Sequence, residues 1–290
     1  MNNQNYYSVI NLLVLIFFAS QMHGQKIEGK LVDSSTKESL AYVNIGVINT
    51  SRGTITDETG KFTLECDHLA EDAQIRFSMI GYKPKLVLVS ELIGMNNKIA
   101  LKKASYSIDE VVVEWKGETR KVGTHRVSNR GVCGWGGANF AKGHELGLRL
   151  ELGSNTVKIN DVNVKVHQQS YDTVLVRLHI RSLKNGIPDK ELLNENIFIN
   201  ISKSRGWQKI ALSKYNILVK GDVALSLEWI RASNVISKRA IRVNGKDDAT
   251  PKILFNIDNK KGTFYTRRGS EAQWKVTDGS SPGLYVSISE

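Results

Sequence analysis

Short stretches in which apolar and polar residues alternate run through the first third of this chain. The alternation is clear at 27–31, 43–45, 62–64 and 75–79, and turns that contain Asp or Gly separate the stretches. A two-residue period places successive side chains on opposite faces of a strand. Short alternating strands between turns therefore predict a small antiparallel β-sandwich over residues 25–105.

The same pattern returns after Gly143 and continues to the end of the chain. Turn signals such as Asn185-Gly186 and Asn244-Gly245 separate the apolar stretches, and no helical period stands out. These features predict an all-β protein, with a larger, jelly-roll-like sandwich over 143–290. The expected strands are 145–152, 157–167, 173–182, 197–202, 208–212, 217–219, 223–230, 252–256, 263–266 and 285–289.

The expected strand 173–182 illustrates the difference between the two faces of a strand in a sandwich. Val174 to Arg181 alternates between aliphatic residues and a mixed set that includes charged side chains. A sandwich strand packs one face into the core and leaves the other mixed. His167 and His179 have polar or charged neighbours on their strands, which predicts that both histidines face solvent.

Residues 106–142 interrupt the regular pattern and are predicted to form a linker. An acidic stretch followed by valines at 108–115 predicts one strand there. The glycine-rich run Gly131–Gly137 predicts an irregular loop, because glycine weakens regular structure. A phosphate-binding loop would need a following helix and a Lys-Ser/Thr pair, and neither is present.

The first 24 residues read as a secretory signal peptide. They contain no charged side chain, and Val9–Ala19 is apolar except at Asn11. Such a run is too short to span a bilayer, and Gly24 is a suitable small residue before a cleavage point. A buried or interfacial N-terminal segment is the alternative. With no later membrane-spanning stretch, we expect an exported protein in the periplasm, at the outer membrane or outside the cell.

Three short motifs of the first domain resemble a known family. They are Gly53-Thr54, Asp57-Glu-Thr-Gly-Lys-Phe62 and Ile80-Gly-Tyr82. Together they resemble the carboxypeptidase regulatory-like (carboxypeptidase D regulatory-like) domain of Bacteroidetes envelope proteins, over residues 26–103. The resemblance implies an Ig/prealbumin-like β-sandwich that acts as a scaffold and has no catalytic residues.

The resemblance also implies two activities that the rest of the chain excludes. The zinc-binding HxxE…H arrangement of the carboxypeptidases is absent. In the large outer-membrane receptors that begin with a similar module, a strand like 108–115 leads to a plug and barrel. The roughly 175 residues that remain here are too few for a 22-stranded transporter barrel. Neither peptidase activity nor transport is expected.

The charge of the chain, +11 overall, is concentrated in its C-terminal half. Residues 150–290 contain 22 Lys and Arg but 14 Asp and Glu. The basic residues are scattered singly on alternating strands, without the clustering typical of nucleic-acid-binding proteins. For an exported protein, this charge favours an acidic polysaccharide or lipopolysaccharide as partner over nucleic acid. A plain solvated surface explains the same charge.

The two cysteines leave two alternatives open. An exported protein with Cys66 and Cys133 can form one disulfide, which would tie the linker to the first domain. Two independent thiols fit equally, because the sequence does not give the required approach of the two Cβ atoms. No CxxC, HxH or HExxH spacing occurs, so neither a metal site nor a cofactor is predicted.

Candidate ligand-binding residues occur in the second domain. Its stretches 181–189, 192–197, 206–215 and 225–229 are weakly reminiscent of galactose-binding or carbohydrate-binding-like sandwiches. Pyranose rings stack on aromatic faces, while guanidinium groups bond sugar hydroxyls. The candidates are Trp207, Tyr265, Arg267 and Trp274. The alternative is that tryptophans such as Trp229 belong to the core.

These observations favour a non-catalytic envelope protein in which the second sandwich binds a glycan or an envelope partner. One alternative is a structural adaptor of an outer-membrane protein complex. Another is a hydrolase, which would need two carboxylates beside a cleft. Glu151, Asp172 and Glu228 are present, but their spacing does not single out a pair.

Overall fold

A computed structural model describes residues 25–104, 119–127, 131–137, 141–202, 204–235, 241–243, 246–248 and 250–290. The predicted signal peptide 1–24 and the predicted strand 108–115 lie outside the described residues. None of the helices in the part that is described has the length and apolar character needed to cross a membrane.

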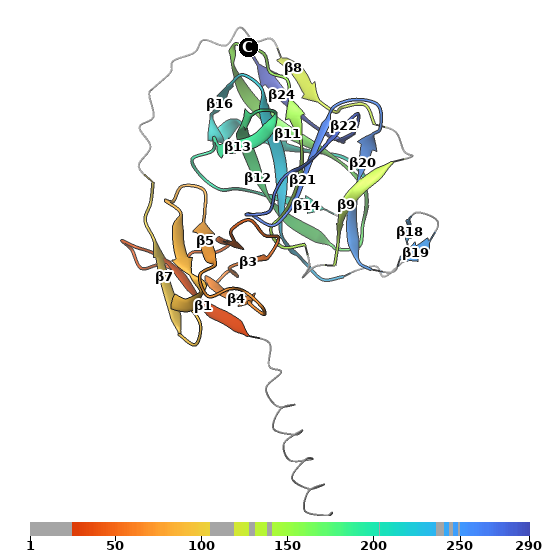
Figure 1. Cartoon of the computed structure of the whole chain (residues 1–290). Helices are drawn as coiled ribbons and strands as arrows, with labels where there is room; N and C mark the ends of the chain where they lie inside the picture. The colour runs from red at the N-terminus through yellow and green to blue at the C-terminus, as the bar shows by residue number, and fades with distance from the viewer. Residues whose placement is uncertain are drawn as a thin grey trace, which may run out of the picture.

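The first domain is a sandwich of a three-stranded and a four-stranded sheet (Figure 1). The smaller sheet has the order β4-β1-β7, in which β7 runs parallel to β1, and the larger has the order β3-β2-β5-β6. The strands are β1 (Lys26–Asp33), β2 (Asn44–Val47), β3 (Gly53–Ile55), β4 (Lys61–Glu65), β5 (Gln74–Ser78), β6 (Lys85–Leu88) and β7 (Asn97–Leu101), with a 3₁₀ turn η1 (Val89–Glu91) after β6.

The alternating residues of the first domain form its core. Ile27, Leu31, Ile75 and Phe77 are fully buried between the two sheets. The predicted turn after β3 is confirmed: Asp57 accepts bonds from the backbone of Thr59 and Lys61 at 2.8 and 2.9 Å, and Gly60 has a φ of 79°. Glycine reaches this left-handed conformation without steric cost.

The second domain is a larger sandwich of two mainly antiparallel sheets. We call the seven-stranded sheet the junction sheet, because the first domain contacts it; its order is β13-β12-β17-β10-β21-β22, with β14 beside β12. Its strands are β10 (His144–Leu150), β12 (Thr173–Lys184), β13 (Ile187–Glu191), β14 (Ile197–Ser202), β17 (Val223–Ala232), β21 (Thr263–Arg268) and β22 (Lys275–Asp278).

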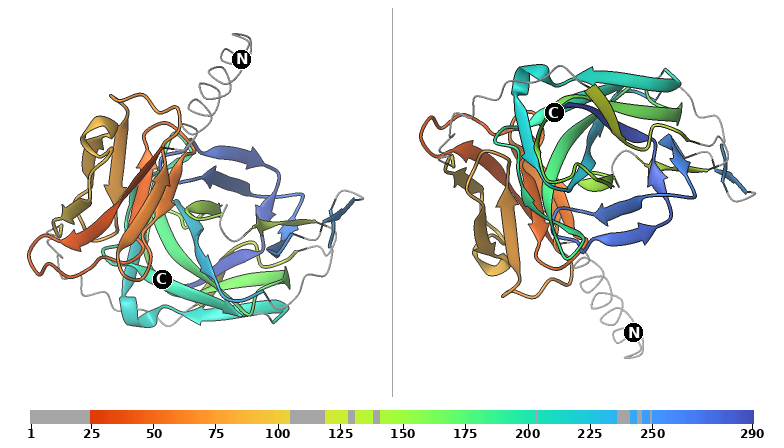
Figure 2. Two further views of the ribbon diagram at one scale, coloured as in Figure 1. Left: turned by 90° about the horizontal axis from the view of Figure 1, so that it is seen from below. Right: turned by 90° about the horizontal axis from the view of Figure 1, so that it is seen from above.

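The eight-stranded sheet, which we call the open sheet, has the order β23-β20-β11-β24-β8, with β15 and β16 beside β11 and β9 beside β20. Figure 2 shows how the two sheets curve around a common interior. The strands are β8 (Thr119–Gly123), β9 (Val132–Gly136), β11 (Thr156–Gln169), β15 (Gly206–Ala211), β16 (Ile217–Lys220), β20 (Lys252–Asp258), β23 (Ser281–Pro282) and β24 (Leu284–Ser289). A 3₁₀ turn η2 (Ser213–Tyr215) and a hairpin of β18 (Ile241–Val243) and β19 (Lys246–Asp248) complete the domain.

The all-β fold with two sandwiches is therefore confirmed, and each of the ten strands expected after Gly143 has a counterpart. The core between the two sheets includes an aromatic group around Trp229, which is fully buried. Trp135 and Tyr171 each meet the Trp229 ring edge-to-face with centroids 5.6 Å apart. Trp229 is thus a core residue, which is the alternative to a ligand-binding role given above for the tryptophans.

The segment predicted as a linker, 106–142, is in part a component of the second sandwich. β8 pairs with β24, and the glycine-rich β9 pairs with β20. Gly134 lies so close to β20 that a Cβ atom there would meet the Ile253 carbonyl oxygen at 2.0 Å. The prediction of an irregular loop was therefore wrong for this segment. Its glycines allow the neighbouring strand β20 to approach closely, and they do not disrupt the strand.

The two cysteines are free thiols in separate domains. The Cys66 thiol follows β4 and donates to the Gln25 carbonyl oxygen at 2.9 Å. Cys133 lies on β9 and packs against the core of the second domain, where burial raises the pKa of its thiol to about 12. The structure therefore has independent thiols and not the disulfide.

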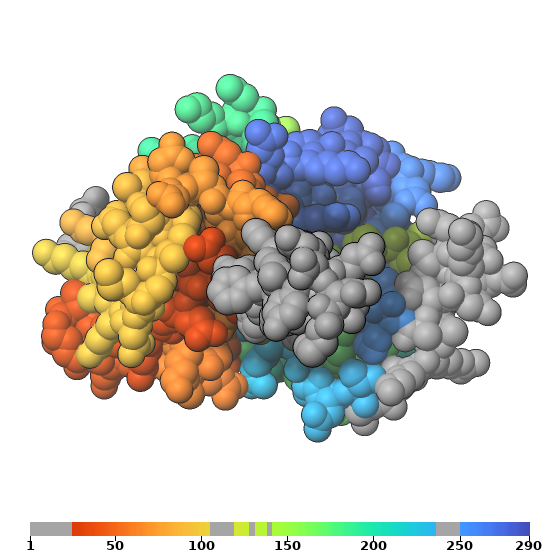
Figure 3. All heavy atoms as spheres, turned by 60° about the horizontal axis from the view of Figure 1, so that its bottom comes forward, coloured from red at the N-terminus to blue at the C-terminus, as the bar shows by residue number. Residues whose placement is uncertain are grey.

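The two domains pack side by side, and the first domain abuts the C-terminal strands of the second (Figure 3). Ile80 of the first domain is part of the hydrophobic core of the second. Its carbonyl oxygen accepts a bond from Asn196 Nδ2 at 3.1 Å, and the Tyr42 ring meets Phe198 edge-to-face at 5.3 Å. An ion pair between Arg231 and Glu58 at 3.0 Å adds to this contact. The interface therefore combines apolar and polar contacts.

Candidate functional site

The face of the junction sheet that points away from the sandwich core carries a buried group of charged residues. Along β12, Val176, Leu178 and Ile180 enter the core, so the residues between them occupy the other face. Arg177 and His179 lie there with only 0% and 3% of their surface exposed. The first domain covers part of this face. Charged side chains that would otherwise meet water are therefore enclosed.

Strand register brings carboxylates next to these cations. Glu145 on β10 lies opposite Glu228 on β17, and Glu228 lies opposite Arg177 on β12. On its other side, Glu145 lies opposite Arg267 on β21. Directly opposed residues of opposite charge stabilise a sheet. We use the name junction cluster for the set Glu145, Arg177, His179, Arg181, Glu191, Glu228 and Arg267.

Glu145 is the best-bonded carboxylate of the junction cluster. Arg181 approaches it with two nitrogens, Nη1 at 2.6 Å from Oε2 and Nη2 at 3.2 Å from Oε1. Arg267 donates from Nε to Oε1 at 2.9 Å, and the Ser226 hydroxyl donates to Oε2 at 2.7 Å. Its side chain has no exposed surface. A buried carboxylate is stable only with such compensation.

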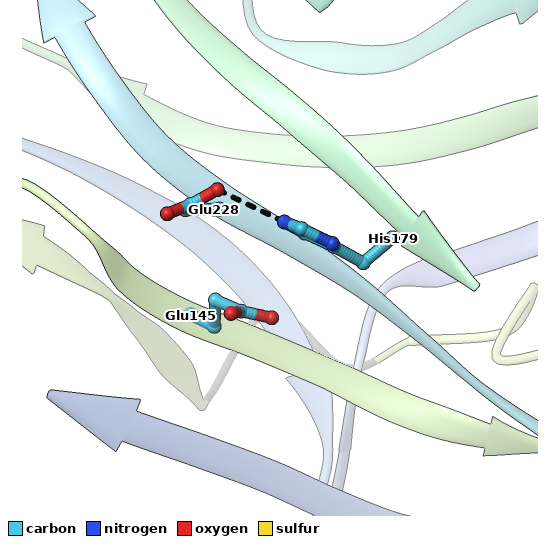
Figure 4. Close-up of side chains that lie close together, drawn as sticks. All are labelled: Glu145, His179 and Glu228. Carbon is cyan, nitrogen blue, oxygen red and sulfur yellow. Dashed lines mark hydrogen bonds and ion pairs between the residues drawn. The ribbon is translucent and has the colours of Figure 1, made fainter. Parts of the chain in front are cut away.

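His179 connects the remaining carboxylates, as Figure 4 shows for Glu228. Its Nε2 lies 2.9 Å from Glu228 Oε2, and its Nδ1 lies 2.6 Å from Glu191 Oε2. An ionised carboxylate only accepts hydrogen bonds, so both ring nitrogens must donate. The lowered pKa values of Glu191 and Glu228 keep both carboxylates ionised, and His179 between them is then a protonated, positively charged imidazole. Arg177 Nε completes the pairing at 3.3 Å from Glu228 Oε2.

The pKa directions agree with this charge assignment. Burial alone would raise the pKa of Glu145, but the charges of Arg181 and Arg267 outweigh it and hold that pKa well below its usual range. Burial likewise opposes ionisation of Glu228, and the charge of Arg177 lowers its pKa. Burial and Arg181 favour neutral His179, yet Glu145 and Glu191 prevail and raise its pKa. The folded state therefore stabilises ionised carboxylates and an imidazolium.

This arrangement predicts how stability depends on pH. Since folding raises the pKa of His179 above its ordinary value of 6.5, its contribution to stability is complete below that pH and is lost as pH rises through the folded-state pKa. The lowered carboxylate pKa values act in the opposite direction, and their contribution is lost in acid. We expect the free energy of unfolding, measured with urea, to fall as pH rises above the ordinary histidine pKa of 6.5.

A matched pair of variants isolates the contribution of His179 to the pH dependence of stability. His179→Gln should remove most of the decline above neutral pH, because glutamine does not titrate. His68→Asn, at an exposed position with a φ of 58°, should retain it. A wild-type decline that persists unchanged in His179→Gln would contradict the assignment of a charged imidazole.

The junction cluster contains the ligand types of a metal site but does not fit a cation. Side-chain atoms of Glu145, His179 and Glu228 lie within 4.8 Å of one another. However, the two glutamates are already paired with arginines, and His179 is held as a cation by its own carboxylates. A divalent ion would enter a space bounded by positive charges. We therefore interpret the set as an ion-pair network and not as a metal centre.

Three of the four predicted ligand-binding residues lie in or beside this network. Arg267 bonds Glu145, and its guanidinium also lies 4.5 Å from the centroid of the half-buried Trp274 ring. Arg181 approaches the same ring at 5.5 Å. Tyr265 is 1% exposed and donates its hydroxyl to the Gly186 carbonyl oxygen at 2.8 Å. In this structure, Trp274 packs against the arginines that hold Glu145.

The sequence-based interpretation of the histidines and carboxylates needs correction. His179 is buried, so the prediction that it faces solvent was wrong, whereas His167 is half-buried and keeps part of its surface exposed. Glu228 belongs to the junction cluster, whereas Glu151 and Asp172 are exposed. The available signal was the placement of charged residues at alternate positions of an otherwise aliphatic strand. Only the covering domain shows that this face is enclosed.

The fourth predicted residue, Trp207, lies on the outward face of the open sheet. It is 37% exposed and meets Tyr285 edge-to-face, with ring centroids 4.9 Å apart. Lys165 lies opposite Trp207 in the register, and its Nζ is 5.5 Å from the Trp207 ring centroid. Lys121 Nζ is 5.3 Å from the centroid of Tyr285. Aromatic rings and ammonium groups thus share one surface.

We call this surface the aromatic face and define it as Lys121, Lys165, Trp207, Lys209 and Tyr285. It extends across β15, β11, β24 and β8, a width of about 14 Å for three strand spacings. Lys209 pairs with the buried Asp161 at 3.1 Å, so one carboxylate partly offsets the lysines. The aromatic face has positive charge, the exposed Trp207 ring beside the half-buried Tyr285 ring, and no covering domain among the described residues.

Comparison with known proteins identifies the first domain. Residues 27–113 match the family model described as CarboxypepD_reg-like domain. The resemblance to a carboxypeptidase regulatory-like domain, predicted from the Gly53, Asp57 and Ile80 motifs, is confirmed for this part of the chain. Domains of this family are non-catalytic. No curated protein matches the chain.

Two solved structures resemble the whole chain at a low level. One contains the cysteine protease and lectin-like domains of Cwp84, a surface layer associated protein of Clostridium difficile, with a TM-score of 0.38 and 10% identity over 93% of this chain. This chain covers 59% of that structure. The other is clostridial cysteine protease Cwp84 after propeptide cleavage, with a TM-score of 0.39, 8% identity, and coverage of 92% of this chain and 70% of that one. Likeness at this level carries no functional argument.

Proposed function

We propose that this chain is an exported, non-catalytic binding protein of the cell envelope that holds an acidic glycan on its aromatic face. The observation that carries the proposal is the pair of the exposed Trp207 ring and the half-buried Tyr285 ring, on a sheet surface that carries three lysines and that no described domain covers. The apolar face of a sugar packs on an aromatic ring, and lysine ammonium groups donate to hydroxyls and carboxylates. The net charge of the C-terminal half favours an anionic partner.

The architecture supports a division of roles between the domains. The first domain belongs to a scaffold family and packs on the junction sheet, while the aromatic face belongs to the other sheet. A ligand there would not compete with the domain contact. The apolar segment at residues 9–19 supports export, where polysaccharides and lipopolysaccharide sugars are available as partners.

The junction cluster supports a binding role over a catalytic one. A hydrolase acting near neutral pH needs a carboxylic acid that keeps its proton. The arginines and His179 instead lower the pKa of Glu145 and of Glu228. Both side chains are fully enclosed, so a substrate would have to displace their partners.

A glycan array probed with the full chain tests the proposal. We expect binding to uronate-containing oligosaccharides or to lipopolysaccharide sugars, and weaker binding to uncharged oligosaccharides of the same length. Trp207→Ala should weaken binding about tenfold or more, because a stacked ring contributes about 1 kcal/mol beyond the area that it buries.

Leu86→Ala is the matched control, because Leu86 is 53% exposed on the first domain. It should leave glycan binding unchanged. The proposal would be contradicted if the chain bound none of the glycans on the array, or if the wild type and Trp207→Ala bound them equally.

A structural adaptor remains the second candidate, and one feature favours it. In the described part of the chain, β6 pairs only with β5 and forms an edge of its sheet. Its residue Leu86 is the more exposed of the large hydrophobic side chains on this strand. Exposed edges can pair with a strand of another protein. Crosslinking in native membranes should then capture an outer-membrane protein through β6, and Leu86→Lys should abolish the capture.

A further inference from the structure

A cavity of about 440 Å³ lies between the two domains, directly beside the junction cluster. The first domain contributes residues of β2, β5 and the following turn, and the second contributes residues of β12, β13 and the turn after β21. Its size falls within the range of small-molecule sites. The aromatic face lies on the other sheet, so this cavity is a separate place in the molecule.

Two buried polar groups that line the cavity lack a hydrogen-bond partner. Arg177 has no exposed surface, and its Nη1 has no hydrogen-bond partner among the described residues. Its Nη2 donates to the Tyr42 carbonyl oxygen, and its Nε makes the ion pair with Glu228 but no hydrogen bond. Asn44 is 6% exposed, and its Oδ1 accepts no hydrogen bond from any residue that the structure describes. A buried polar group without a partner costs about 1–3 kcal/mol. Two such groups on one cavity are potential hydrogen-bonding partners for a bound molecule.

Arg177 and Asn44 require different partner atoms in a ligand. A guanidinium nitrogen needs an acceptor and prefers a carboxylate or phosphate oxygen. The amide oxygen of Asn44 needs a donor, such as a hydroxyl. Because Arg177 comes from the second domain and Asn44 from the first, one molecule that satisfies both would bridge the domains. A plain carboxylate lacks the donor, and a neutral sugar lacks the charge.

Other charges around the cavity leave room for an anion. Arg76 and Lys190 line it, and the nearest acidic partner of Arg76 is Glu271 at 3.7 Å. Glu191 already forms an ion pair with His179. Burial raises the pKa of Glu271, which reduces its repulsion of an incoming anion. Asp189 is the remaining carboxylate on the lining.

We propose that the interdomain cavity binds a small hydroxycarboxylate of the sugar-acid class. Its carboxylate accepts a hydrogen bond from Arg177 Nη1, and one of its hydroxyls donates to Asn44 Oδ1. Since the ligand contacts both domains, its binding strengthens their association and stabilises the folded chain. This site is independent of the aromatic face, and either can exist without the other.

Calorimetric titration of the full chain with four probes tests the ligand class without any substitution. Galacturonate carries both groups, glucose lacks the carboxylate, acetate lacks the hydroxyl, and inorganic phosphate replaces the carboxylate. We expect galacturonate to bind at least tenfold more tightly than each of the other three. Equal affinity for phosphate or acetate reduces the site to a simple anion site and overturns the proposal, as does absence of galacturonate binding at millimolar concentration.

Variants then locate the site. Asn44→Asp replaces the amide with a carboxylate, whose negative charge repels the carboxylate of the ligand, and should raise the dissociation constant for galacturonate at least tenfold. Asn200→Asp, at an exposed position of β14, adds the same charge elsewhere and should leave it unchanged. Trp207→Ala should also have no effect. Loss of galacturonate binding in Trp207→Ala, with retention in Asn44→Asp, places the ligand on the aromatic face and overturns the proposal.

Discussion

Glu145→Gln is expected to lower the free energy of unfolding by about 3–5 kcal/mol, the usual cost of removing one partner from a buried ion pair. Glu145 has no exposed side-chain surface and holds Arg181 and Arg267 through paired hydrogen bonds. Glutamine keeps the size of the side chain but removes its charge. Both guanidinium groups would then stay enclosed without a counter-charge at this position.

Urea denaturation at neutral pH gives the measurement, and Glu151→Gln provides the control. Glu151 is exposed just beyond the end of β10, so its substitution should change stability by less than about 0.5 kcal/mol. If Glu145→Gln were as mild as the control, the junction cluster would not be an important source of stability.

Trp229→Ala is expected to cost a similar amount, about 3–5 kcal/mol, through a different mechanism. The Trp229 ring is fully buried, and it contacts Trp135 and Tyr171 edge-to-face. Its removal leaves a cavity between the two sheets that stiff neighbouring strands cannot fill. The Trp229 indole nitrogen makes no hydrogen bond within the described part of the chain, so the loss comes from packing.

Trp207→Ala is the matched comparison, since it removes the same side chain from an exposed strand position. Its expected cost is about 1 kcal/mol, mainly from lost contact with Tyr285. Denaturation of both variants separates the core tryptophan from the surface one. Equal losses would contradict the assignment of Trp207 to an open surface.

Most of the fold follows from the alternating pattern, and the exceptions have physical causes. Strands such as β11 and β12 bury one full face, so their apolar residues recur at every second position. β9 is rich in glycine and buries little besides Trp135. β8 buries only Val122. Their pairing with β20 and β24 is fixed by neighbours distant in the sequence, and a local pattern does not contain that information.

The candidate site was harder to predict, because its environment depends on two domains. Arg177, His179 and Arg181 look like the solvent side of a strand, and they would be solvated in an isolated sandwich. The first domain and the turn with Trp274 enclose them. Trp207 and Trp274 have similar polar surroundings in the sequence, yet the fold separates them. The local sequence shows which residue types are present, but it does not show which of them the fold buries.

Hydroxyl-radical footprinting tests the central claim, that the aromatic face is the glycan-binding surface. The full chain is oxidised with and without an oligogalacturonate, and the modification of each tryptophan is measured by mass spectrometry. We predict strong protection of Trp207 and Tyr285, with little change at Trp274. Protection confined to Trp274 and the first domain, with Trp207 oxidised at the same rate in both samples, would contradict it.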